Sequence, residues 1–397
     1  MLHAGQAPAP KAHALLLALA LSPLLVHLPY SASIVLHAAL AVYVGAWRSV
    51  KPEPPQESMS DGDAYRFPLV GSCVLFGLFL CFKFLPKSLV NALLAAYVVS
   101  LGAFVVVSTV LPFCEPLFPP ALRDRVVALP TIPAIPFLGF PEPTVLEPTV
   151  PELVLAGPSI ALGTWYFVTK SWLANNLLGL AFSLVGIEAL SLGSTRTGAI
   201  LLAGLFVYDV FWVFCTPVMV SVARNFEAPI KLLFPRISLG AIRKATAAAA
   251  KAAAAKAGAA APASAASHFA MLGLGDIVIP GLFVALMLRH DVERRFASSY
   301  FPTAFWAYVG GVATTIVVMN VFKAAQPALL YIVPSVLGAL AAHSALKGEF
   351  WALFRWKEAH VLAEEREAAE EEARAAKEAA KAGGKGGGGG SSSKKTK

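Results

Sequence analysis

The sequence predicts an all-α polytopic membrane protein with nine transmembrane helices. Hydrophobic residues make up 57% of the 397 residues and charged residues only 14%, whereas soluble domains carry about 25% charged residues. Mean hydropathy is +0.66. Apolar runs long enough to cross a bilayer recur along the chain, separated by polar or proline-containing segments. These observations exclude a soluble domain with a single anchor.

The apolar block from His13 to Trp47 is too long for one span and has little room for two. We therefore expect one span at 30–47, preceded by an apolar segment, 1–29, that does not cross the membrane. Residues 12–26 also resemble the core of a signal peptide, because Lys11 precedes them. A cleaved leader thus stays an alternative.

The remaining spans follow from the other apolar runs. The nine spans are expected at about 30–47, 68–85, 88–112, 153–169, 174–192, 198–222, 268–288, 301–322 and 327–346. They divide the chain into helices 1–3 (30–112), a proline-rich loop (113–151), helices 4–5 (152–193), a core of helices 6–9 (197–346) and a charged tail (347–397).

Three segments between or after the spans have a biased composition. Proline excludes regular helix from the proline-rich loop, which is either a surface loop or a docking segment for a partner. Residues 239–267 are alanine-rich and carry too many lysines to span, which favours an inserted solvent loop. Residues 357–382 predict a charged, solvated helix, and the glycines and serines that follow form a linker.

Two acids lie inside apolar runs, Asp209 in span six and Asp276 in span seven. A carboxylate at the centre of a transmembrane helix costs about 2.5–3.5 kcal/mol even on the lenient insertion scale. Asp209 lies 12 residues from Thr197, and Asp276 lies 13 residues from Arg289. In an antiparallel pair of helices, both acids would lie about 18–20 Å from the same surface. The sequence therefore predicts that they can face each other.

Two close carboxylates in a low dielectric share one proton, so one can activate a water while the other polarises a peptide carbonyl. Gly273 and Gly275 allow close backbone approach, and Pro280 cannot donate to the carbonyl of Asp276. The hydroxyl of Tyr208 could also reach a polar site. Spacing alone leaves two alternatives open, a protease and an ion or proton-coupled transporter or channel.

Metal, cofactor and nucleic-acid functions receive no support from the sequence. The four cysteines form no CxxC pair, and no HExxH occurs. Much of the net charge of +8 lies in loops and the tail, where lysine and arginine set membrane topology. We expect no cofactor, no metal and no nucleic-acid partner.

Three motifs in chain order resemble those of the GxGD intramembrane aspartyl proteases, which comprise the presenilins and the signal peptide peptidases. The matching residues are Tyr208-Asp209, Gly273-Leu274-Gly275-Asp276 and Pro327-Ala328-Leu329. Longer stretches, among them WLANNLLGLAFSL and FEAPIKLLFP, are similar to signal peptide peptidase. The similarity covers roughly residues 40–350. An unusual alanine-rich loop and the lack of an N-terminal N-x-[ST] site depart from the family without touching the motifs.

This resemblance implies a presenilin-like bundle in which Asp209 and Asp276 are the catalytic pair and the Pro-Ala-Leu segment shapes the active site. It implies cleavage of type II-oriented transmembrane helices in the lipid bilayer, such as remnant signal peptides in the endoplasmic reticulum. It leaves a homo-oligomer open. A transporter that uses the same acids and a scaffold that only binds such helices are the rival hypotheses.

The resemblance also implies a lumenal N-terminus and a cytosolic C-terminus. Arg48 and Lys51 after the first span agree with this orientation, whereas the many cations in loop 222–268 oppose it. Lys394 and Lys395 resemble a dilysine retrieval signal for the endoplasmic reticulum, which works only from the cytosol.

Overall fold

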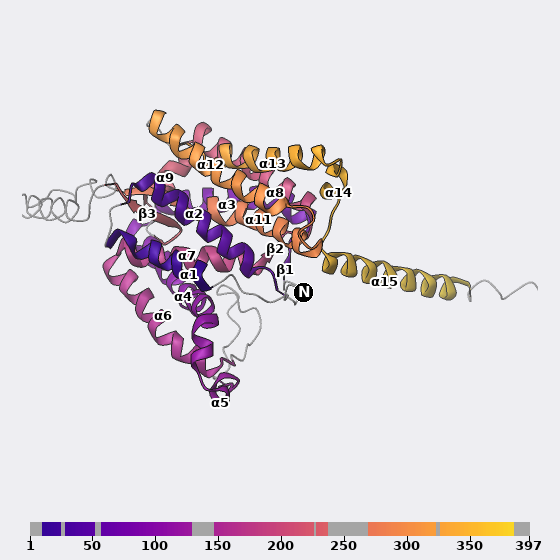
Figure 1. The fold of residues 1–397 in the computed structure, drawn as a ribbon, viewed down its shortest axis with the longest axis horizontal. Coiled ribbons are helices and arrows are strands. Elements are labelled where there is room, and N and C mark those ends of the chain that lie inside the picture. The colour runs from indigo at the N-terminus through magenta and orange to yellow at the C-terminus, as the bar shows by residue number, and fades with distance from the viewer. Residues whose placement is uncertain are drawn as a thin grey trace, which may run out of the picture.

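The computed structural model describes residues 10–24, 28–51, 57–128, 147–225, 228–236, 269–322 and 326–384. The alanine-rich loop, most of the proline-rich loop and the Lys394-Lys395 pair lie outside these ranges. The described chain is an elongated helical bundle from which the last helix projects (Figure 1). This agrees with the predicted all-α polytopic membrane fold.

The described part of the N-terminal half consists mainly of helices. They are α1 (Pro10–Leu21), the 3₁₀ turn η1 (Ser22–Leu24), α2 (Tyr30–Arg48), α3 (Asp61–Phe84), α4 (Lys87–Cys114), the 3₁₀ turn η2 (Glu115–Leu117), α5 (Pro120–Arg123), α6 (Val150–Thr169) and α7 (Trp172–Ala189).

The C-terminal half continues the series and ends in the charged tail. Its helices are α8 (Thr195–Val210), the π-helical turn η4 (Phe211–Cys215), α9 (Val218–Asn225), α11 (Gly275–Glu293), α12 (Tyr300–Phe322), α13 (Leu329–Leu346), α14 (Phe350–Phe354) and α15 (Ala359–Gly384).

Seven helices among the described residues are long and apolar enough to cross a membrane: α2, α3, α4 with η2, α7, α8 with η4, α12 and α13. The predicted count of nine is therefore not confirmed. Helices α6 and α11 have 20 and 19 residues but do not meet the same test. Helix α11 carries four charged residues, including Asp276 and Arg289.

The second predicted span begins earlier than expected, at Asp61 rather than 68. A capping box explains the difference. The Asp63 N–H donates to the Ser60 hydroxyl at 3.2 Å, and the Asp63 carboxylate accepts from the Ser60 N–H at 3.2 Å. These reciprocal bonds satisfy donors that the first turn leaves free.

The sixth predicted span, 198–222, is not one continuous helix. Helix α8 ends at Val210 and passes into the π-helical turn, and Thr216 is extended, with φ −139° and ψ 150°. Pro217 follows, and a proline disfavours helical backbone in the residue before it. Helix α9 then starts at Val218.

The seventh predicted span, from 268, begins as a strand rather than a helix. Strand β4 (Phe269–Gly273) pairs antiparallel with β3 (Lys231–Pro235), with Leu233 opposite Met271. The sequence predicts a loop for residues 231–235. A second, two-residue pairing joins β1 (Glu57–Ser58) to β2 (Leu190–Ser191) in parallel. The hairpin leads directly into α11 and Asp276.

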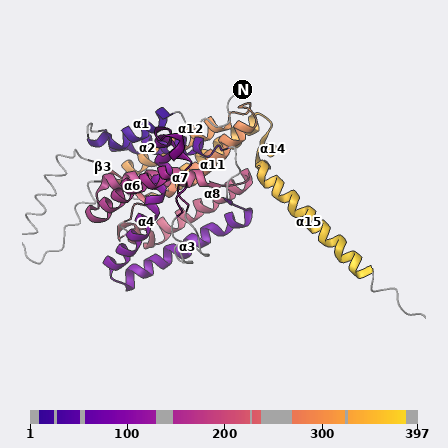
Figure 2. The ribbon, with the colours of Figure 1, turned by 90° about the horizontal axis from the view of Figure 1, so that it is seen from below.

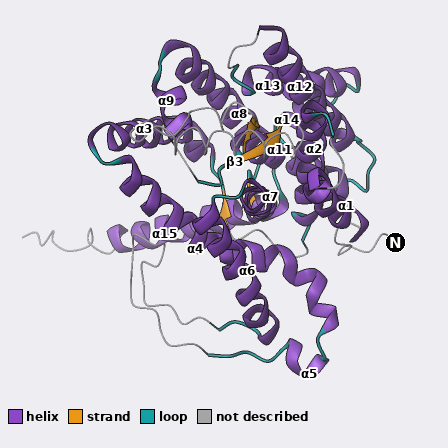
Figure 3. Cartoon of the chain, turned by 90° about the vertical axis from the view of Figure 1, so that its left-hand side faces the viewer, coloured by secondary structure: helices purple, strands orange, loops and turns teal. Residues whose placement is uncertain are grey.

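Helix α11 lies at the centre of the bundle, where it packs against α2, α7, α8, α12 and α13 (Figure 3). Its residues Leu282–Leu288 are each at most 3% exposed. Helices α3 and α4 lie toward the outside, and α15 extends away from the bundle (Figure 2). The two predicted acidic helices, α8 and α11, are therefore neighbours in the interior.

Glu188, near the end of α7, is paired. Its carboxylate accepts from Arg48 Nε at 2.6 Å and lies 2.8 Å from Lys51 Nζ. Glu188 therefore has two cationic partners. On α11, Arg289 pairs with Glu358, which precedes α15.

Candidate active site

Asp209 lies in the last turn of α8 and is 5% exposed. Its carboxylate oxygen Oδ2 accepts a hydrogen bond from the backbone N–H of Leu329 at 3.1 Å. Leu329 is the first residue of α13, and the first N–H groups of a helix have no partner within the helix. The positive end of the α13 dipole therefore points at the Asp209 carboxylate.

This bond shows what the Pro-Ala-Leu segment does in the fold. Pro327 and Leu329 are buried and Ala328 is half-buried. The segment starts α13 at the depth of Asp209 and presents one free N–H to it. The sequence motif and the acid are 120 residues apart but in direct contact.

Asp276 lies in the first turn of α11 and is half-buried. Strand β4 brings the chain to it, and the Leu274 N–H donates to the Ile230 carbonyl at 3.0 Å. A side chain at Gly273 would put its Cβ 3.2 Å from the Asp276 oxygen Oδ2. Glycine at position 273 therefore avoids a close contact with the Asp276 carboxylate. Gly275, the first residue of α11, is exposed.

Asp209 and Asp276 lie on two neighbouring helices, α8 and α11. The helices pack against each other, and the two carboxylates are close enough to interact electrostatically. Asp209 is the more buried of the two and is held by α13, while Asp276 is reached through the glycine-flanked turn. No group of three potential metal-ligating side chains occurs in the described ranges.

The backbone carbonyl of Asp276 has a partner that the sequence analysis missed. Pro280, four residues later, has no N–H to donate to it. The hydroxyl of Tyr308, from α12, donates to this carbonyl at 3.2 Å. Tyr308 is 0% exposed. The free acceptor could be predicted from Pro280, but its partner comes from a helix whose packing the sequence does not fix.

A second missed pair, Asn175 and Asn176 of α7, supports the hairpin. The Asn176 side chain accepts from the Leu233 N–H at 2.8 Å and donates to the Leu233 carbonyl at 2.8 Å. Asn175 donates to the Lys231 carbonyl at 2.7 Å. The two side-chain amides therefore hydrogen-bond to the open edge of β3, as the backbone of a neighbouring strand would. This gives the asparagines of the WLANN stretch a structural role.

Tyr208 neighbours Asp209 in the chain and its ring faces α3. A Cβ on Gly71 would lie 3.7 Å from the Tyr208 ring, and the Trp212 ring is 6.4 Å away. Trp212 in turn donates to the Ser72 hydroxyl at 3.0 Å. This aromatic pair joins α8 and its π-helical turn to α3.

A model of the signal peptide peptidase family matches residues 51–360 of the chain. The chain belongs to the signal peptide peptidase family. It is 41% identical over 337 residues to the human signal peptide peptidase, covering 83% of each protein. It is also 41% identical over 215 residues to intramembrane protease 2 of Caenorhabditis elegans, covering 50% of this chain and 42% of the relative.

A more distant family member covers nearly as much of the chain. A probable intramembrane protease of Schizosaccharomyces pombe is 29% identical over 330 residues, which is 81% of this chain and 92% of that protein. The predicted family resemblance is therefore confirmed. The transporter alternative receives no support from these comparisons.

Proposed function

We propose that this member of the signal peptide peptidase family is an intramembrane aspartyl protease whose catalytic pair is Asp209 and Asp276. One observation carries the proposal. Two carboxylates from neighbouring helices lie close enough to interact electrostatically, and one of them accepts a hydrogen bond from the N–H of Leu329. The names of the relatives, signal peptide peptidase and intramembrane protease, support the same reaction class.

The reaction needs a pair of carboxylates that hold one proton between them. The ionised carboxylate takes a proton from a water, and the oxygen of that water attacks the peptide carbonyl carbon. The protonated carboxylate donates its proton to the carbonyl oxygen, giving a gem-diol. The carboxylates then exchange roles, so that the nitrogen leaves as an amine and the C–N bond breaks. Neither a metal nor an organic cofactor takes part.

The fold supports this assignment by holding both acids still. Leu329 fixes the Asp209 carboxylate, and Tyr308 fixes the backbone of Asp276. The Asn175–Asn176 pair fixes the hairpin that leads into Asp276. Small errors in the placement of reacting groups strongly reduce rate, so such supports are what a two-carboxylate site requires.

The substrates under this proposal are type II-oriented transmembrane helices, including remnant signal peptides, in the membrane of the endoplasmic reticulum. The name of the human relative supports the signal-peptide part of this assignment. The proposed orientation has a lumenal N-terminus and a cytosolic tail. Arg48 and Lys51 support it, because they follow the first predicted span.

The deciding experiment measures cleavage of a labelled type II transmembrane peptide by the purified protein. Asp209→Asn and Asp276→Asn should each lower turnover at least about 10³-fold. Each variant keeps a single carboxylate, which cannot act as the general base and the general acid at the same time. Glu293→Gln is the matched control, since Glu293 is an exposed acid on the same helix as Asp276. It should keep wild-type turnover.

Folding is checked by size-exclusion chromatography and circular dichroism on all three variants. Normal turnover by either aspartate variant would refute the proposed pair. Ion flux into proteoliposomes that depends on both aspartates, without any peptide product, would instead favour the transporter hypothesis.

A further inference from the structure

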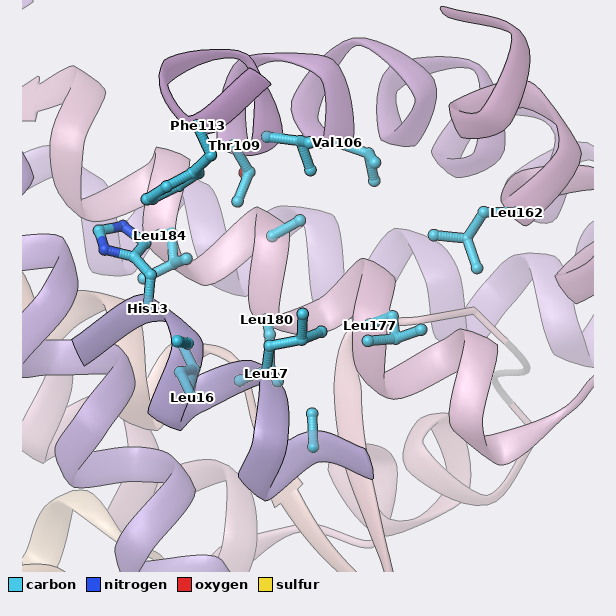
Figure 4. Close-up of a pocket in the computed structure, with 14 residues that line it drawn as sticks. His13, Leu16, Leu17, Val106, Thr109, Phe113, Leu162, Leu177, Leu180 and Leu184 are labelled. Carbon is cyan, nitrogen blue, oxygen red and sulfur yellow. The ribbon is translucent and has the colours of Figure 1, made fainter. Parts of the chain in front are cut away.

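A second site of the molecule lies away from the two aspartates. A cavity of about 480 Å³ opens between α1, α4, α6 and α7. Figure 4 shows side chains from these helices pointing into it from several sides. They include Leu17 of α1, Val106 and Phe113 of α4, Leu162 of α6, and Leu177 and Leu184 of α7.

The walls of this cavity are almost entirely carbon. Of its lining residues, only His13 and Thr109 have polar side chains. The Thr109 hydroxyl donates to the Val105 carbonyl of its own helix at 2.8 Å, and the His13 ring packs 4.5 Å from the Phe113 ring. Apolar cavities of this kind do not retain water, because a bound water needs several polar partners. The occupant must therefore be apolar.

Size excludes a substrate helix as the occupant. A helix with its side chains is about 10–12 Å across, so the cavity of about 480 Å³ would hold roughly one turn of it. The volume falls within the range of about 300–1,000 Å³ that is typical of sites for small ligands. A single hydrocarbon chain is much thinner than a helix and fits this shape.

Charged groups stand at one end of the cavity. Arg48 donates to the carbonyl of the lining residue Thr109 at 3.1 Å and to Glu188 at 2.6 Å. Glu188 follows the lining residue Leu184 by one helical turn and lies 2.8 Å from Lys51 Nζ. The Lys51 side chain is 54% exposed, and the three side chains together carry one net positive charge. The apolar cavity thus has the accessible ammonium group of Lys51 near one end.

We propose that this cavity binds one acyl chain of an anionic phospholipid, with the lipid phosphate at the Lys51 ammonium. The bilayer supplies such chains at high concentration, and cations near the membrane surface attract anionic headgroups. The lysine can bind a phosphate oxygen while Arg48 stays engaged with Glu188 and the α4 carbonyls. This site is independent of the proposed protease activity.

The test uses phosphatidylglycerol with a photoactivatable diazirine in one acyl chain, at a few mole per cent in phosphatidylcholine nanodiscs that hold the full chain. After illumination, mass spectrometry should place the label on α1, α4 and α7 residues that line the cavity. Ala14→Phe and Ala181→Phe fill the cavity from two different helices, α1 and α7. Each should lower this labelling at least about five-fold, while Ala342→Phe, at an exposed position of α13, should leave it unchanged.

The headgroup is tested with Lys51→Gln. This variant should lower labelling by the phosphatidylglycerol probe about five-fold, the factor expected for one cation near the membrane surface. Labelling by a phosphatidylcholine probe with the same acyl chain should fall less, because its choline cation offsets the charge of the phosphate. If Ala181→Phe fails to fold, Ala181→Leu and Ala14→Phe still test the cavity, since α1 lies at the edge of the bundle (Figure 2).

Three results would overturn the proposal in whole or in part. Equal labelling in wild-type protein and both filling variants would mean that the probe reports bulk lipid only. Preferential labelling of the same residues by a sterol diazirine would assign the cavity to a sterol instead. Insensitivity of both phospholipid probes to Lys51→Gln would remove the phosphate from the assignment.

Discussion

Helix α11 buries 12 of its 19 residues, whereas α3 buries 2 of its 24. Helix α3 faces outward and is apolar nearly all round, as a helix that meets lipid must be. Helix α11 is enclosed by five other helices. Its ionisable residues find protein partners, such as Arg289 with Glu358 and Asp291 with the Phe301 N–H at 2.8 Å.

This contrast explains why α11 carries more charged residues than a lipid-facing span tolerates, although it lies at the centre of the bundle. Lipid disfavours charged residues, and α11, which carries four of them, has protein neighbours along its length instead. Helix α11 can carry the candidate acid Asp276 because other helices, rather than lipid, surround it. In this family member, enclosure by other helices permits the polar site.

The largest expected difference between the two regions is in packing. Leu286→Ala, at a 0% exposed position of α11, should lower the free energy of unfolding by about 2–5 kcal/mol, because the closely packed neighbours cannot fill the space. Leu93→Ala, at a 63% exposed position of α4, should change it by less than about 0.5 kcal/mol. Unfolding in mixed detergent–SDS micelles measures both. Equal losses would mean that α11 is no better packed than the periphery.

A smaller effect is expected where α12 meets α13. A Cβ on Gly311 would lie 2.7 Å from the backbone Cα of Ile332, which cannot move aside as a side chain could. Gly311→Ala should therefore cost about 1–3 kcal/mol and displace the start of α13, which holds Asp209.

Gly310 provides the matched control for this prediction, because a Cβ there meets nothing within 4 Å. Gly310→Ala should be neutral or stabilise the helix by up to about 1 kcal/mol. Thermal unfolding and peptide turnover of the two variants give the comparison. Similar behaviour of both would show that the α12–α13 contact is not tight.

The smallest predicted effect concerns a single hydrogen bond. Tyr308→Phe removes the hydroxyl that donates to the Asp276 carbonyl and should lower kcat about ten-fold with little change in KM, equivalent to about 1.4 kcal/mol. Pro280→Ala restores an N–H that can donate to the same carbonyl. The double variant should therefore recover most of the lost activity.

Tyr97→Phe, at a 41% exposed position of α4, is the control and should retain full activity. If Pro280→Ala deepens the defect of Tyr308→Phe rather than relieving it, the hydroxyl acts in some way other than by satisfying this carbonyl.

The sequence by itself determined the membrane class, the position of most helices and the two candidate acids. It also determined one free acceptor, the Asp276 carbonyl, because proline has no N–H. The family followed from three short motifs in order, and the comparisons confirm it. The membrane class, the helix positions and the two acids follow from local composition and spacing, whereas the family followed from the resemblance of the motifs.

Only the tertiary structure decided how the helices meet. Lipid chains are as apolar as leucine, so an apolar helix face does not specify whether lipid or another helix covers it. The Leu329–Asp209 and Tyr308–Asp276 contacts therefore could not be predicted from sequence. The pairing of β3 with β4 could not be predicted either, because the two strands are more than 30 residues apart in the sequence.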